Sequence, residues 1–408
     1  MWSEIRKEID VMRIVDNHEH LNRAFPIFTN DDKYEMDLKT FLTYGYLFGD
    51  LISAGMKGPP VRLGELKQYI EDVKNTSYYR YLLIALHDLF GLEEEDLNDR
   101  NWDTISSRIV ARSEDHVKWS IEVLDKMGVF KVILDISKGC LANTKIIEDP
   151  RLVQVVKMDD FITGVSDVAA PFTDEKIQSV DEYCNALDMA FEKAIKDGAI
   201  GVKSALAYNR VISHETIEKS TAERIFRQGV KASSPNEKKA FQDFMMHAVC
   251  ERCDKYRLPL QVHTGIQAGN YNTITNAKPT HLTTLFRKYP RVRFDLFHGG
   301  YPYMQEAGIL AKYFPNVYLD ACWLDHISPT AYRKGLSEWL EIVPSNKIFA
   351  WGGDHEIIEH SYASLMLVKD LIADVLSEKV HSGYFTKEVA MSTARKILGE
   401  NAIKLYRF

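Results

Sequence analysis

Six polar side chains stand at the ends of short apolar runs, and their types suit a bound divalent cation. They are His18, His20, Lys203, His263, His298 and Asp354. Neutral imidazoles and carboxylates are the ligands of borderline cations such as Zn²⁺, and an open coordination position leaves room for a water molecule. A bound cation lowers the pKa of that water toward ~7 and polarises a carbonyl or phosphoryl oxygen. We therefore expect one or two divalent ions, with Zn²⁺ the best match.

The spacing of His18 and His20 places both imidazoles on one face of a strand, because strand side chains alternate between two faces. The same alternation turns Lys203 toward the inside of a barrel and does the same for His263 at the end of its strand. His298 ends a strand that alternates less clearly, so the pattern gives weaker support for its direction.

Short apolar runs that are typical of buried strands recur along the chain. They cover residues 13–21, 130–137, 161–169, 199–208, 258–266, 292–300, 316–324 and 347–355. Amphipathic helical patterns separate most of them, as at 179–198, where apolar residues recur at steps of three and four. Parallel strands need helical crossovers and a closed sheet leaves no unpaired edge, so the alternation predicts a (β/α)8 barrel of the α/β class. An open doubly wound sheet is the alternative, although no GxGxxG follows the first strand.

Two gaps between the predicted strands are longer than an ordinary crossover. Residues 22–130 have helical character and are predicted to form a helical insertion subdomain within one distorted barrel domain spanning residues 1–408. Further on, the basic, Ser-rich stretch 230–239 is predicted to be an extended loop before a helix at 241–256. In such barrels the chemistry gathers at the carboxyl ends of the strands, which is where the six polar side chains lie.

The composition of the 408-residue chain excludes several classes of protein. Hydrophobic residues make up 45% and charged residues 27%, as in ordinary soluble domains. The formal net charge is −7 without a long block of one sign, so nucleic acid is not an expected partner. Five scattered cysteines favour free thiols in a reducing compartment, and no apolar run is long enough to span a bilayer. We expect a cytoplasmic protein with a small-molecule substrate and no membrane partner, and a homo-oligomer is compatible with this composition.

The set of motifs resembles the amidohydrolase superfamily of metal-dependent hydrolases, and within it the amidohydrolase 2 branch. The motifs are HEH at 18–20, GVKSALAY at 201–208, QVHTGI at 261–266, LFHGG at 296–300, GGDH at 352–355 and ILGENAIKLY at 397–406. The helical insertion, with its DLFGL segment at 88–92, is more weakly similar to that of the uronate isomerases. The resemblance implies a (β/α)8 barrel with a metal centre.

By this resemblance, His18 and His20 hold one metal ion, and Asp354 is both a ligand and the group that takes a proton from water and returns it to the leaving group. The other residues have two alternative roles. If Lys203 is carboxylated, its carbamate bridges two ions, and His263 and His298 bind the second. Otherwise His263 joins the first ion, His298 polarises the substrate or orients water, and an unmodified Lys203 pairs with a substrate carboxylate or phosphate.

Three further residues are candidates for substrate contacts. Arg210 lies in the loop beyond Lys203, where its guanidinium could clamp an anion. Trp323 and His355 follow the last two predicted strands, where the walls of a substrate pocket belong. We expect hydrolysis of an amide, ester or lactone bond in a small polar, anionic molecule. The alternatives are a non-hydrolytic member of the same superfamily, namely a uronate isomerase or a decarboxylase, and a metal-binding domain without activity.

Overall fold

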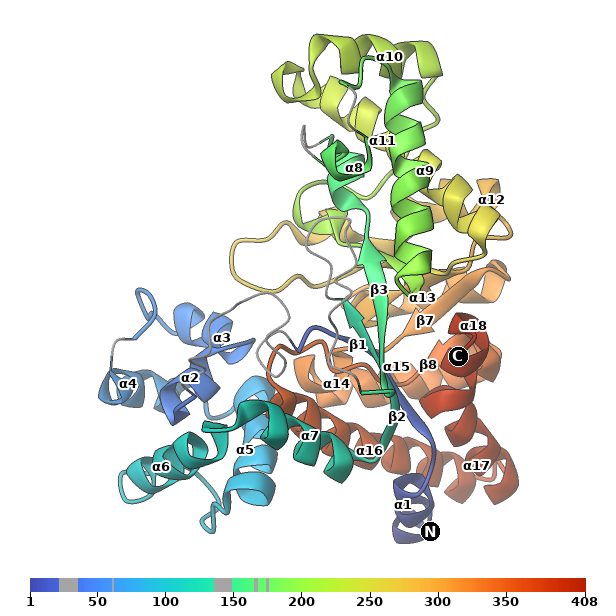
Figure 1. Cartoon of the computed structure of the whole chain (residues 1–408). Coiled ribbons are helices and arrows are strands. Elements are labelled where there is room, and N and C mark those ends of the chain that lie inside the picture. Colours follow the sequence, from blue (N-terminus) through green and yellow to red (C-terminus); the bar gives the residue numbers. More distant parts are fainter. Residues whose placement is uncertain (22–35, 61, 136–148, 165–167, 174–175) are drawn as a thin grey trace.

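The computed structural model describes residues 1–21, 36–60, 62–135, 149–164, 168–173 and 176–408. Eight parallel strands pair in sequence order around a barrel (Figure 1). They are β1 (Ile14–Glu19), β2 (Val129–Asp135), β3 (Leu152–Lys157), β4 (Ala199–Ser204), β5 (Leu260–Val262), β6 (Phe294–Leu296), β7 (Val317–Asp320) and β8 (Ile348–Phe349). The predicted (β/α)8 fold is confirmed.

Backbone hydrogen bonds join β1 to the residues that follow β8 and so close the barrel at its carboxyl end. The amide of Asn17 donates to the carbonyl oxygen of Trp351 at 3.4 Å, and the amide of Asp354 donates to the carbonyl oxygen of His18 at 2.9 Å. The amide of His20 donates in turn to the carbonyl oxygen of His355 at 3.1 Å. These bonds place the first and last predicted site residues side by side.

The third strand lies earlier in the chain than the sequence analysis predicts. The prediction at 161–169 is wrong, because β3 is Leu152–Lys157 and the segment Asp159–Thr163 forms the short helix α8. Residues 165–167 of that run lie outside the described ranges. Asp159 and Asp160 occupy the first turn of α8, where acidic side chains are favoured, and Gly164 ends the helix with a left-handed φ of 70°. These flanking residues favour a helix, although the apolar content of the run is compatible with a strand.

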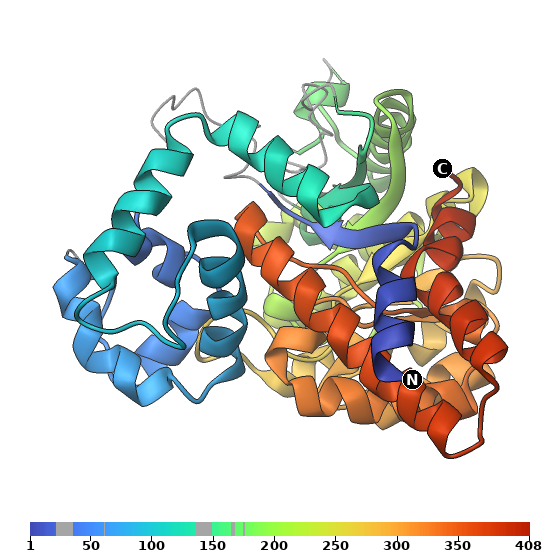
Figure 2. The same cartoon turned by 90° about the horizontal axis from the view of Figure 1, so that it is seen from below.

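Helices fill the described part of the chain between β1 and β2, as predicted, while residues 22–35 lie outside the described ranges. They are α2 (Leu38–Thr43), α3 (Leu47–Ser53), α4 (Leu63–Val73), α5 (Ser77–Phe90), α6 (Trp102–Ser113) and α7 (His116–Met127). Figures 1 and 2 show them together on one side of the barrel, away from both chain ends. Helices α5 and α7 pack against α16 (Ile358–His381), which ties this group to the barrel.

The remaining α-helices of the described ranges accompany the strands. They are α1 (Trp2–Asp10), α9 (Val180–Lys196), α10 (Lys219–Gln228), α11 (Pro235–Tyr256), α12 (Thr283–Lys288), α13 (Met304–Tyr313), α14 (Leu324–Ile327), α15 (Pro329–Ile342), α17 (Lys387–Arg395) and α18 (Asn401–Tyr406). The predicted helix at 179–198 is confirmed as α9. Across the described ranges, no helix combines the length and the apolar character that crossing a membrane requires.

The predicted extended loop at 230–239 is wrong over its second half, because α11 already begins at Pro235. Ser234 and Glu237 form a capping box, in which each side chain bonds the backbone amide of the other residue. Proline is favoured at the first position of a helix, where its missing N–H is not needed. The basic, polar composition that suggested a loop belongs instead to the first turns of a helix.

The alternation predicted for β5 and for the second half of β4 is confirmed, whereas Ala199 packs in the main core with Val202, contrary to the predicted alternation. Leu260 and Val262 pack in the main hydrophobic core, whereas the side chain of Gln261 donates to the hydroxyl of Tyr406 at 2.8 Å. A Cβ on Gly201 would lie 3.2 Å from the ring of Tyr406, so this position of β4 faces the same side as Gln261. Lys203, two residues further along β4, lies on that same face and is buried.

Candidate metal centre

The carboxylate of Asp354 is the centre toward which three of the predicted histidines converge. Its Oδ1 lies 3.2 Å from Nε2 of His20 and 3.5 Å from Nε2 of His18. Its Oδ2 lies 3.9 Å from Nε2 of His298. Residues that are up to 336 positions apart in sequence therefore meet at the carboxyl end of the barrel.

The spacing around Oδ1 of Asp354 fits a shared divalent cation. Ligands bound tetrahedrally at about 2.0–2.1 Å lie about 3.3 Å from one another. The distances from Oδ1 to His20 and His18 are 3.2 and 3.5 Å. Nδ1 of His20 lies 3.2 Å from the carbonyl oxygen of Asp135, and such a bond would place its proton on Nδ1 and leave Nε2 free to bind an ion. His18, His20 and Asp354 therefore have the donor set of a cation site, and both imidazoles lie at ligand spacing from the carboxylate.

His263 contacts the centre through His298. Nδ1 of His263 lies 3.0 Å from Nε2 of His298, and Nε2 of His263 lies 2.8 Å from the carbonyl oxygen of Ile266. Nδ1 of His298 lies 3.0 Å from the carbonyl oxygen of Cys322. Because a carbonyl oxygen only accepts, these two outer contacts use the one N–H of each neutral imidazole. Two nitrogen lone pairs then face each other between His263 and His298, an arrangement that a cation or a proton between them would stabilise.

An unusual backbone conformation positions the residues that follow the last strands. His298, Trp323 and Asp354 have φ values of 59°, 66° and 63°. Left-handed backbone costs an ordinary residue roughly 1–2 kcal/mol, and such strain is concentrated at functional sites. The side chains facing the barrel from β6 include Asp295, which accepts a hydrogen bond from Tyr406, and the left-handed turn then brings His298 to the centre. Strand alternation alone could not predict this.

Lys203 lies beneath the histidines in a buried position. Its Nζ lies 3.5 Å from the centroid of the Phe297 ring, and the same ring packs edge-on against His18 with centroids 4.8 Å apart. Burial lowers the pKa of Lys203, although the carboxylates of Asp354 and Asp135 oppose this effect. A lowered pKa favours carboxylation, which needs the neutral amine, whereas pairing with a substrate carboxylate or phosphate needs the ammonium. Both roles of Lys203 remain proposals.

The electrostatics of the centre favour an ionised Asp354 and neutral imidazoles at His18 and His298, whereas at His20 the hydrogen bond to Asp354 and its charge outweigh burial and raise the pKa. Burial by itself raises the pKa of Asp354, but the hydrogen bond from His20 and the charges of the surrounding histidines hold it well below its ordinary value. Burial lowers the pKa of His18 well below its ordinary value and lowers that of His298 to about 4. An ionised carboxylate at Asp354 and a neutral imidazole at His18 are the protonation states that metal ligands need, and a cation bound by His20 would have to replace the proton on its Nε2.

Two residues at the barrel mouth were missed by the sequence analysis. Asp135 ends β2, and one ligand atom each from His18, His20 and Asp135 lies within 4.8 Å of the others. Lys157 ends β3, and its Nζ lies 3.0 Å from Oδ2 of Asp135. Lys157 was overlooked because the third strand was placed too late in the sequence. Its position after an apolar run, like that of Lys203, was the available signal.

A cavity of about 380 Å³ opens over the centre. The lining residues that bear polar groups are His20, Thr43, Tyr44, Tyr46, Tyr208, Asp354, His355, Glu356 and His360. His355 thus lies where the sequence analysis placed it, with Nε2 3.1 Å from the hydroxyl of Tyr81. Trp323 is buried behind the wall and stacks on Tyr46 with ring centroids 4.2 Å apart, so it supports the wall without lining the cavity.

Arg210 does not line this cavity, in contrast to its predicted role as an anion clamp. Its Nη2 donates to Oδ1 of Asp243 at 2.5 Å and to the carbonyl oxygen of Ser213 at 2.7 Å. Its Nη1 lies 3.2 Å from Oε1 of Gln242, which is also on α11. The guanidinium is occupied by these structural contacts.

Comparison with known proteins matches the second half of the chain to a family. Residues 213–408 match the amidohydrolase 2 family, whose description is amidohydrolase, and these residues include His263, His298 and Asp354. The match covers just under half of the chain. The amidohydrolase resemblance predicted from the motifs is thereby confirmed. Over 231 residues the chain is 33% identical to protein fluG of Emericella nidulans, a match that covers 52% of this chain and 26% of fluG. The match therefore spans about a quarter of that relative's length.

Solved structures share the fold along nearly the whole chain at low sequence identity. A glucuronate isomerase from Caulobacter crescentus superposes with a TM-score of 0.80 at 16% identity, covering 100% of this chain and 93% of the isomerase. A protein from Lactobacillus casei named for metal-dependent hydrolase activity gives a TM-score of 0.70 at 17% identity, covering 99% of this chain and 97% of its own. At such identities the likeness establishes the fold alone. The expected similarity to uronate isomerases is confirmed at that level.

Proposed function

We propose that this protein is a metal-dependent hydrolase that cleaves an amide, ester or lactone bond in a small polar molecule. The observation that carries the proposal is the convergence of His18 Nε2 and His20 Nε2 on one oxygen of Asp354, at 3.5 and 3.2 Å. When bound, a divalent cation, with Zn²⁺ the best match to these ligands, would supply Lewis acidity and make a water molecule more acidic. The amidohydrolase match of residues 213–408 supports the same chemistry.

The residues of the centre then have separate roles in hydrolysis. His18 and His20 hold the cation, and the ionised carboxylate of Asp354 accepts a proton from the attacking water and returns it to the leaving amine or alcohol. His263 and His298 present two facing nitrogens beside this carboxylate, 3.0 Å apart. That pair would hold a second cation if Lys203 is carboxylated, and a single-cation site would leave the pair to orient water or substrate.

The cavity restricts the substrate to a small molecule. Its volume of about 380 Å³ lies at the lower end of the range for ligand pockets, roughly 300–1,000 Å³. Lys157 lies outside the lining of this cavity, as Arg210 does, and its ammonium pairs with Asp135 at 3.0 Å. The charge of Asp135 raises the pKa of Lys157 against the effect of burial, so the ammonium is retained at neutral pH.

A uronate isomerase is the second candidate. The glucuronate isomerase of Caulobacter crescentus covers 100% of this chain, so its similarity extends over the helical insertion that contributes Tyr44 and Tyr46 to the cavity. Isomerisation would use the same cation and carboxylate but would not consume water. The two candidates therefore differ in a single measurable respect, the incorporation of a solvent oxygen atom into product.

The test is a screen of the metal-loaded protein against amides, esters, lactones and uronates, followed by mass spectrometry of any product formed in ¹⁸O-labelled water. We expect one solvent oxygen in the newly formed carboxylate. Because a carbonyl oxygen can exchange with water without enzyme, each product is also incubated in labelled water alone as a control. Turnover of a uronate without incorporation beyond this control would replace the hydrolase with the isomerase.

A further inference from the structure

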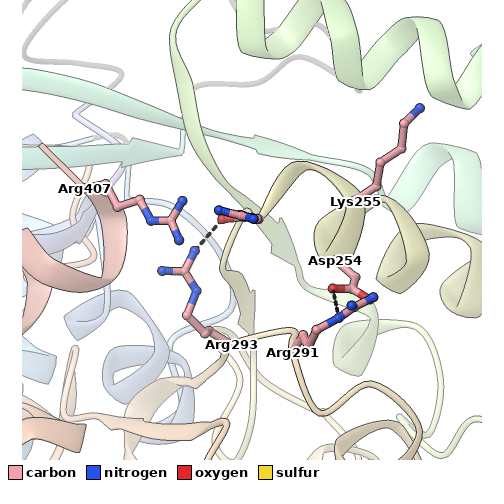
Figure 3. A pocket seen from close by; sticks show the side chains of 6 residues that line it. Asp254, Lys255, Arg291, Arg293 and Arg407 are labelled. Carbon is pink, nitrogen blue, oxygen red and sulfur yellow. Dashed lines mark hydrogen bonds and ion pairs between the residues drawn. The ribbon is translucent and has the colours of Figure 1, made fainter.

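A second cavity, of about 490 Å³, lies at the opposite end of the barrel from the candidate metal centre. Its lining consists of Asp254, Lys255, Arg257, Arg291, Arg293 and Arg407 (Figure 3). Arg257 precedes β5, and Arg291 and Arg293 precede β6, so the cavity belongs to the amino ends of these strands. We call this group of residues the basic cavity. Five cations and one carboxylate line it, in a chain whose net charge is −7.

The one carboxylate of the basic cavity is already neutralised. Nε of Arg291 lies 2.9 Å from Oδ1 of Asp254, and Nη2 of Arg291 lies 2.7 Å from Oδ2. Among the residues that the structure describes, no ion pair to a carboxylate is formed by Arg257, Arg293 or Arg407. The cavity therefore holds several positive charges without a counter-ion from the chain.

Backbone carbonyl groups hold Arg293 in place. Its Nη1 donates to the carbonyl oxygen of Leu405 at 2.5 Å, and its Nη2 donates to the carbonyl oxygen of Arg257. The guanidinium groups of Arg293 and Arg407 lie close to each other in Figure 3. Burial lowers the pKa of Arg293, and the charge of Arg407 lowers it further. Two like charges in this arrangement repel each other, and an anion between them would remove the repulsion.

The backbone of two of the arginines is also informative. Arg257 and Arg407 terminate α11 and α18 with φ values of 57° and 65°. Glycine is the residue usually favoured at such left-handed helix ends, because it has no Cβ. Arginine at both positions places side chains, at a small cost in backbone energy, around the same cavity.

We propose that the basic cavity binds a phosphate-bearing small molecule, with its phosphate between Arg293 and Arg407. The planar guanidinium forms paired hydrogen bonds to phosphate oxygens, which a fixed Arg293 and a facing Arg407 could share. A volume of about 490 Å³ is sufficient for a small phosphorylated ligand. This site is separate from the proposed hydrolase centre, which lies at the other end of β6 in the neighbourhood of His298.

The proposal is tested by titrating the full chain with inorganic pyrophosphate in a calorimeter at about 150 mM salt, where diffuse charge effects are largely screened. We expect saturable binding with one site per chain. Arg407→Gln should weaken it about tenfold or more, since a charge-assisted contact to phosphate is lost. Arg407 is exposed, so this variant is expected to fold.

The matched control is Arg224→Gln, which removes an arginine of α10 that pairs with Glu237 at 2.8 Å on the surface. This variant changes the net charge equally and should bind pyrophosphate as the unmodified chain does. Absence of saturable binding to the unmodified chain would overturn the proposal. Equal weakening in both variants would also overturn it, because the effect would then be one of net charge.

Discussion

Two carboxylates, the partly buried Asp354 and the fully buried Asp243, show how a candidate metal centre differs from a structural ion network in the same protein. Asp243 on α11 lies 2.5 Å from Nη2 of Arg210 and 2.6 Å from Nζ of Lys239, and it accepts a hydrogen bond from the amide of Glu215 at 3.1 Å. Asp354 is surrounded instead by imidazole nitrogens at 3.2 to 3.9 Å. Asp243 has permanently charged partners at 2.5 and 2.6 Å, whereas Asp354 has imidazole partners at 3.2 to 3.9 Å.

The pKa alone does not distinguish the two. Hydrogen bonds and charges outweigh burial at both carboxylates and lower the pKa of each below its ordinary value. The partners decide the function, because Arg210 and Lys239 satisfy Asp243 fully, whereas the imidazoles around Asp354 leave room for an ion between them. A strongly shifted pKa therefore indicates a functional site only together with the chemistry of its neighbours.

The largest expected effect is that of Asp354→Asn on turnover. The amide retains an oxygen that can face a cation but cannot accept the proton of water, so kcat should fall about 10²–10⁴-fold while metal content is retained. Steady-state kinetics and elemental analysis of the same preparation measure both quantities. Unchanged kcat would remove Asp354 from proton transfer, and loss of the metal would assign it chiefly to metal binding.

Asp243→Asn should have the reverse profile. Removing this charge leaves Arg210 buried without its counter-ion, and breaking such a pair destabilises a protein by about 3–5 kcal/mol. Urea unfolding of the metal-free protein should show this loss, while kcat of the folded protein stays within a few-fold of the unmodified chain. If the variant has unchanged stability but reduced kcat, the structural role assigned to Asp243 is contradicted.

A smaller effect is expected from His214, which lies beside Asp243 with Nδ1 3.5 Å from its Oδ1. Burial lowers the pKa of His214 to about 4, so the unfolded chain takes up a proton near its ordinary value of about 6.5 while the folded chain does not. This residue therefore weakens folding as the pH falls from about 6.5 toward 4, by up to about 1.4 kcal/mol per pH unit. His214→Asn should flatten that part of the stability curve measured by urea unfolding, and an unchanged slope would contradict the assignment.

Much of the barrel and most of the centre follow from local sequence patterns. The alternation on β5 correctly separated Leu260 and Val262 from the interior, and His18 and His20 could be paired from their spacing alone. The prediction of the third strand at 161–169 is wrong because an apolar run is compatible with either a strand or a helix. Asp159 and Asp160, in the first turn of α8, favour the helix.

Other features depend on contacts between distant residues that no local pattern contains. The partner of Arg210 lies 33 positions away on α11, and only the fold reveals that Asp243 occupies the guanidinium. The cavity wall contributed by Tyr44 and Tyr46 depends on how the helical insertion packs over the barrel mouth. The close packing around Gly299, where an added Cβ would lie 2.6 Å from Trp339, likewise depends on the tertiary structure.

The most direct test of the central claim is X-ray anomalous scattering from crystals of the metal-loaded protein, with elemental analysis of the dissolved crystals. The account predicts a peak within bonding distance of His18, His20 and Asp354, and a second peak between His263 and His298 only if Lys203 carries a carboxylate. A loaded protein with no peak beside His18 and His20, or with its metal elsewhere, would contradict the proposed centre.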